Sequence, residues 1–162
     1  MPISSQIAIA AQDYQRNNAL LKKGIDGLTA EEWRLRPNDS SNHMLWIVGH
    51  VVWTRSVLLN FLGTSWTRPW LSLFARGAKL DEAAAYPTPE EAMLAWQETS
   101  ELLTAAMEGA PDEVLDKPSP QGIPSADRKV SGVVNFLAHH ETYHIGQVAY
   151  LRCWLGHGGI AG

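Results

Sequence analysis

The chain has 162 residues, of which 45% are hydrophobic and 19% are charged, and its seven tryptophans are typical of a packed globular core. This length predicts a single domain over residues 1–162, with enough chain to bury a sizeable core. The net charge of −4 and the scattered Lys and Arg residues argue against a nucleic-acid partner, and no charged leader precedes a long apolar run. We therefore expect a cytoplasmic protein that does not contact membranes.

Apolar residues recur at helical spacing in four long stretches, which predicts four amphipathic helices. The first covers residues 3–24 and ends at Gly24 or Gly27. A polar connection follows over residues 28–42, and its serines can cap the second helix, which covers residues 42–62.

The two later helices have recognisable first residues. Thr88, followed by Pro89 and two glutamates, is typical of a capping box with a proline in the first turn. The fourth helix begins near Lys129 or Val130 and ends at Gly156. Four helices of comparable length without a strand pattern predict an all-α fold, a four-helix bundle with long inter-helix connections. Connections this long leave the order of the helices open.

The connection over residues 64–87 is unusually apolar. Its large apolar side chains are Trp66, Trp70, Leu71, Leu73 and Phe74. Because so much apolar surface is rarely left to water, we expect a short helix here that packs over the bundle or against a second subunit.

Three histidines lie within the apolar stripes of two predicted helices. His140 and His144 are four residues apart and share one helix face, and His50 shares an inward face with Trp46 and Trp53. A lone buried histidine is usually a hydrogen-bonded core residue. An inward pair with a third inward histidine instead offers the nitrogen ligands that zinc, nickel and iron(II) prefer. We therefore predict that His50, His140 and His144 bind a metal ion.

Three protein ligands leave a coordination position open to water or substrate, as in catalytic metal sites. The sequence thus predicts a divalent-metal-dependent enzyme, a hydrolase or a thiol-dependent transferase that acts on a small molecule. Zinc and nickel fit the histidines best, and iron and manganese are further candidates. The alternative is a non-catalytic stress-response bundle that holds a metal or small ligand for stability, which requires a closed coordination shell.

Three neighbours of the histidines are candidate catalytic groups, namely Glu141, Tyr143 and Gln147. The segment also spells H-E-x-x-H, in which metallopeptidases use the glutamate as a base, but only His157 follows as a third ligand. Glu141 lies to the side of the histidine face, so it is either a proton-transfer group or a carboxylate between helices. Tyr143 fits the wall of the site, and Gln147 could orient a ligand or a bound water.

Three further residues are weaker ligand candidates. His43 lies two turns before His50, and we expect it at the rim of the site. Cys153, the only cysteine, lies on a different face of the fourth helix from His140 and His144, and we interpret it as a small apolar residue. Asp13 lies off the buried stripe of the first helix, which argues against a ligand role.

The pattern G-H-x-x-W at His50, with H-E-x-x-H-x-G-Q from His140 to Gln147, resembles the DinB and YfiT-like superfamily of metal-dependent enzymes. The likeness covers nearly the whole chain and its four helices. It implies a four-helix bundle of this type in which His50, His140 and His144 are the metal triad. Gly146 and Gln147 match the trailing G-Q of the family.

The resemblance also implies a cosubstrate and a partner. The wider superfamily includes transferases and isomerases that use bacillithiol, mycothiol or glutathione, so a low-molecular-weight thiol is an expected cosubstrate. Homodimers are common among such proteins, and the aromatic connection would suit one. The family name refers to DNA damage, yet no residue pattern here suggests DNA contact.

Overall fold

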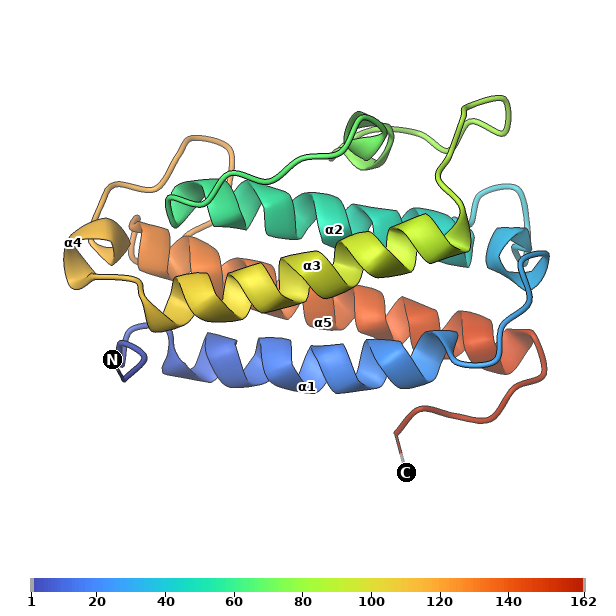
Figure 1. Cartoon of the computed structure of the whole chain (residues 1–162), viewed down its shortest axis with the longest axis horizontal. Coiled ribbons are helices and arrows are strands. Elements are labelled where there is room, and N and C mark those ends of the chain that lie inside the picture. The colour runs from blue at the N-terminus through green and yellow to red at the C-terminus, as the bar shows by residue number, and fades with distance from the viewer. Residues whose placement is uncertain (1, 162) are drawn as a thin grey trace.

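Four long helices lie side by side in the computed structural model, which describes residues 2–161 (Figure 1). They are α1 (Ala8–Ile25), α2 (Met44–Phe61), α3 (Pro89–Glu108) and α5 (Val130–Trp154). Helix α5 packs against α1 and α2, and α2 also packs against α3. Apart from an isolated bridge between Pro118 and Lys129, the described residues contain no β structure. The all-α prediction is confirmed.

The first helix is shorter at its start than the sequence pattern predicts. Residues 5–7 form a turn, and α1 begins only at Ala8, with Ile7 as an N-cap residue that makes no side-chain hydrogen bond to the helix. Gly24 lies within α1, where a Cβ would overlap the side chain of Val148 on α5. The helix ends before Gly27, whose φ of 73° is the left-handed conformation that favours glycine.

The cap of α2 differs from the predicted one. His43 is the N-cap, and its Nδ1 accepts a hydrogen bond from the backbone N–H of Trp46 at 3.0 Å. The hydroxyls of Ser40 and Ser41 both donate to Asn38 instead, at 2.7 and 3.0 Å. The prediction that a serine caps α2 was wrong, because Asn38 holds both hydroxyls in a local turn and Ser41, the nearer serine, lies two residues before the N-cap position.

Acid should destabilise the fold partly through His43. Burial, with Arg34 and Arg36 adding to it, lowers the pKa of His43 from 6.5 to about 4. Between those pH values the unfolded chain takes up more protons than the folded one, so stability falls as the pH falls, by about 3 kcal/mol at most for this group. His43→Asn keeps a capping acceptor but does not titrate.

We expect the unfolding free energy of His43→Asn to fall less between pH 6.5 and pH 4 than that of wild type. Urea denaturation with a chelator present measures both. His139→Asn, an exposed histidine on α5, is the matched control. An unchanged pH slope in His43→Asn would contradict the assignment.

Helix α3 begins as predicted. The Thr88 side chain accepts from the backbone of Glu91, the Glu91 carboxylate accepts from the backbone of Thr88, and Pro89 is the first helical residue. In the apolar connection before α3, residues Leu71–Phe74 form a short 3-10 helix, η2, which packs against α2. This is the short helix that the aromatic content of the connection predicts, and it covers the bundle.

Two other short elements occur, namely the 3-10 helix η1 (Glu32–Arg34) after α1 and the single-turn helix α4 (Asp112–Leu115) before α5. Helix α2 is the most buried of the long helices. By length and composition alone it could cross a membrane, but 78% of that 18-residue window is buried by the rest of the fold. It therefore has the burial of a core helix, and it carries one of the three histidines.

Candidate metal site

The structure brings His50, His140 and His144 together at the contact between α2 and α5. One ring nitrogen from each can be chosen so that all three lie within 4.8 Å of one another. The ring centroids of His50 and His144 are 4.8 Å apart, and those of His140 and His144 are 4.5 Å apart. The helical spacing in the sequence correctly predicted that these imidazoles converge.

His50 is oriented by the η2 segment. Its Nδ1 lies 2.7 Å from the carbonyl oxygen of Phe74, so Nδ1 carries the hydrogen and donates it, and Nε2 is left with its lone pair. Gly49 makes this contact possible, because a Cβ at position 49 would overlap the Phe74 ring. The G-H pair of the sequence thus lets η2 approach α2 closely enough to fix the tautomer of His50.

His144 is oriented from within its own helix. Its Nδ1 lies 2.7 Å from Oε1 of Gln147, which accepts the hydrogen and leaves Nε2 with its lone pair. The amide nitrogen of Gln147 lies 3.4 Å from the hydroxyl of Tyr143. Tyr143 itself is 62% exposed, so it borders the site from the solvent side. Gln147 therefore positions a histidine, as a hydrogen-bond partner behind a metal ligand does.

The nitrogens of the α5 pair are spaced as ligands of one ion. Nε2 of His140 lies 3.2 Å from Nε2 of His144. Two nitrogens bound to one tetrahedral zinc lie roughly 3.3 Å apart, given the usual Zn–N distance. Nδ1 of His140 is buried and has no hydrogen-bond partner among residues 2–161. The donor set fits a metal ion, with two of the three imidazoles held from behind by protein groups.

Electrostatics favour neutral imidazoles at this site. Burial lowers the pKa of His50, and it lowers the pKa of His144 to about 4, with His50 and His140 adding to the effect. Burial also lowers the pKa of His140, and the nearby charges of His50 and Arg76 lower it further. Because a metal binds the neutral imidazole, these shifts keep the three side chains ready to bind near neutral pH.

Glu141 is engaged elsewhere. Its two carboxylate oxygens accept hydrogen bonds from Nε and Nη2 of Arg55, both at 2.8 Å, and both side chains are 1% exposed. Arg55 also donates to Ser100 and Asn18, at 2.5 and 2.7 Å. The sequence left two roles open for Glu141, and the structure gives it the second, a carboxylate between helices. Its network with Arg55 joins α1, α2, α3 and α5.

The remaining candidate ligands lie away from the histidine cluster. His157 pairs with Glu32 at 2.8 Å, so the third ligand that a peptidase would need is not in place. Asp13 pairs with Arg16 on α1, Cys153 is an exposed free thiol, and His43 caps α2 as described above. Within the described residues, the cluster holds three histidines and no carboxylate.

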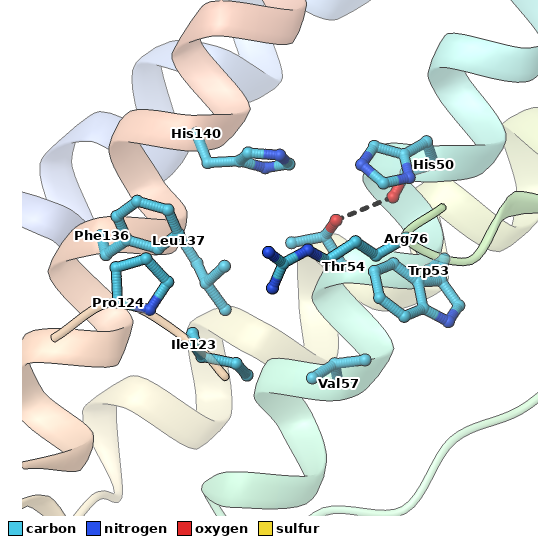
Figure 2. A pocket seen from close by; sticks show the side chains of 10 residues that line it. All are labelled: His50, Trp53, Thr54, Val57, Arg76, Ile123, Pro124, Phe136, Leu137 and His140. Atoms are coloured by element: carbon cyan, nitrogen blue, oxygen red, sulfur yellow. Dashed lines mark hydrogen bonds between the residues drawn. The ribbon is translucent and has the colours of Figure 1, made fainter. Parts of the chain in front are cut away.

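A pocket of about 250 Å³ opens beside His50 and His140 (Figure 2). Its other lining residues are Trp53, Thr54, Val57, Arg76, Ile123, Pro124, Phe136 and Leu137. The walls are therefore mostly apolar and come from α2, α5 and the connections that precede α3 and α5. Two of the three histidines face a space that a small molecule could fill.

A family model described as the DinB superfamily matches residues 13–148, which include all four long helices in whole or in large part and all three clustered histidines. The chain belongs to the DinB superfamily. Comparisons with curated proteins and with solved structures gave no match. Superfamily membership and the histidine cluster are together compatible with a metal-binding protein.

The roles of three groups in this DinB-superfamily site were not predicted from the sequence. The Phe74 carbonyl and the Arg76 side chain lie in a connection without helical periodicity, so no pattern pointed to them. Gly49 was visible as the residue before His50, and a glycine inside an otherwise apolar helix is the signal of a close approach that could have identified it.

Proposed function

We propose that this chain is a divalent-metal-dependent enzyme whose ion is held by His50, His140 and His144. The observation that carries the proposal is the convergence of three imidazoles from two helices beside an apolar pocket. Zinc and nickel suit this all-nitrogen set best, and iron and manganese are the other ions to test. When bound, such an ion supplies Lewis acidity, which lowers the pKa of a water or a thiol brought to it.

The chain's own groups would prepare this chemistry. The Phe74 carbonyl and the Gln147 amide oxygen hold two imidazoles so that each presents Nε2. The apolar walls of the pocket exclude water and accept the body of a small substrate. Tyr143 stays a candidate for proton transfer and Gln147 for substrate contact through its amide nitrogen, whereas Glu141 has both oxygens occupied by Arg55.

We favour two reaction classes, thiol-dependent transfer and hydrolysis, each on a small molecule with a low-molecular-weight thiol or water as the nucleophile. Three protein ligands beside an open pocket support catalysis over a purely structural ion. The alternative, a non-catalytic stress-response bundle that binds a metal or ligand, requires a fourth protein ligand or a sealed site. Spectra of the cobalt-substituted protein with and without an added thiol separate the two, because only an open site changes.

The architecture and assembly belong to the same proposal. We interpret the chain as a single-domain four-helix bundle of the DinB and YfiT-like type with long connections, acting in the cytoplasm as a homodimer. Helix α5 supports self-association, because Tyr143, Tyr150 and Trp154 are exposed at positions that share one face of the helix. Sedimentation analysis of wild type and of Tyr150→Ser tests whether this stripe holds two copies together.

Metal content tests the central claim. We expect the purified chain to hold about one divalent ion, and His144→Ala to lose most of it, because two imidazoles bind far more weakly than three. His139→Ala is the matched control: it removes an exposed histidine of the same helix and should keep the ion. Elemental analysis after gel filtration gives the answer, and equal metal in both variants would overturn the proposal.

A further inference from the structure

The pocket beside the histidines contains one charged side chain in an otherwise apolar wall. Arg76 is the only charged residue among those that line it. Figure 2 shows its guanidinium extending across the pocket towards Leu137 and His140. No acidic residue lines the pocket, so the exposed Arg76 gives its solvent side a positive charge in a chain whose net charge is −4.

Arg76 is only partly engaged by the protein. Its Nη1 donates to the carbonyl oxygen of Gly122 at 2.6 Å, which ties the connection after η2 to the connection before α5. Within residues 2–161 this is its one hydrogen bond, and no carboxylate lies within salt-bridge distance. By contrast, Arg55 and Arg68 both pair with glutamates. The guanidinium of Arg76 therefore keeps donors available to a ligand.

The chemistry of a complementary ligand follows from these contacts. A planar guanidinium whose Nε/Nη2 edge is free matches a carboxylate, which accepts two parallel hydrogen bonds from such an edge. The side chains of Val57, Leu137 and Phe136 offer apolar contact over the rest of the pocket. A space of about 250 Å³ lies at the small end of the range of ligand pockets, which suits a small ligand.

We propose that this pocket selects a small carboxylic acid with an apolar body, held by its carboxylate on Arg76 beside the three histidines. This names the substrate class of the proposed metal-dependent enzyme and rests on that function for the reaction. The binding itself does not require the ion. It can therefore be tested on its own, in the full chain dialysed against a chelator.

Hexanoate and its neutral analogue hexanamide are suitable probes, because they have the same size and differ in charge. We expect the metal-free chain to bind hexanoate about tenfold more tightly than hexanamide at low salt, through charge-assisted hydrogen bonds. Nuclear magnetic resonance titration followed at the indole N–H of Trp53, a lining residue, measures both affinities. Equal affinities in wild type would overturn the proposal.

Substitutions identify the group responsible. Arg76→Gln should lose the preference for hexanoate and keep the affinity for hexanamide, and Arg76→Lys should retain part of the preference. Lys79→Gln, which removes a positive charge from the same connection outside the pocket, should behave as wild type. If Arg76→Gln weakens both probes equally, Arg76 only shapes the pocket and the proposal fails. Because no metal is present, none of these results depends on a bound ion.

Discussion

Replacing Glu141 with alanine is expected to cost about 3–5 kcal/mol of unfolding free energy. The substitution leaves the Arg55 guanidinium charged, 1% exposed and without its carboxylate partner. Ser100 and Asn18 still accept from Arg55, but neither carries a charge to offset its burial. Loss of one partner of a buried ion pair is among the most destabilising single changes in a protein interior.

Urea denaturation of wild type and Glu141→Ala measures this loss. Glu101→Ala, an exposed glutamate of α3, should change stability by less than about 0.5 kcal/mol and is the control. The double variant Arg55→Met with Glu141→Leu should recover much of the loss, because it removes both charges together. A change below about 1 kcal/mol in Glu141→Ala would mean that water reaches the pair.

A second variant, Glu141→Gln, tests the role of Glu141 at the histidines. Both of its oxygens bind Arg55, so the folded fraction of Glu141→Gln should keep wild-type metal content. A metallopeptidase would instead need this carboxylate free to act as a base. Loss of metal in folded Glu141→Gln would show that the carboxylate serves the cluster and not the bundle.

Gly49→Ala is expected to weaken metal binding about 10- to 100-fold without touching a ligand. The new Cβ would overlap the ring of Phe74, which is fully buried and cannot move outward without opening a void. Displacing Phe74 also displaces the carbonyl that holds Nδ1 of His50. Overpacking of this kind typically costs about 1–3 kcal/mol of stability as well.

Competition with a chromophoric chelator measures the affinity, and urea denaturation measures the stability. Gly146→Ala is the matched control, since it lies two residues from His144 on α5 with nothing within 4 Å of an added Cβ. That control should keep the metal and gain about 0.5–1 kcal/mol from helix propensity. Equal metal affinity in the two variants would show that the position of η2 does not control His50.

Most of the helical framework could be predicted because it depends on local signals. The capping box at Thr88 and the four-residue spacing of His140 and His144 depend on residues within one turn of each other. The cap of α2 was mispredicted because two local hydrogen-bonding choices competed: the serine hydroxyls bind Asn38, and His43 caps the helix in their place. The start of α1 was also mispredicted, by several residues. The short η2 helix was expected from composition alone, without its bounds.

The sequence by itself determined the all-α fold and the faces on which three histidines lie, because helical periodicity places side chains without knowledge of the partner helix. Only the tertiary structure decided which groups meet those faces. Ser100 and Asn18 lie on different helices and far apart in the sequence, yet they and Glu141 surround Arg55. Arg76 and the Phe74 carbonyl reach the site through connections whose paths depend on contacts far apart in the chain, and no local pattern encodes those contacts.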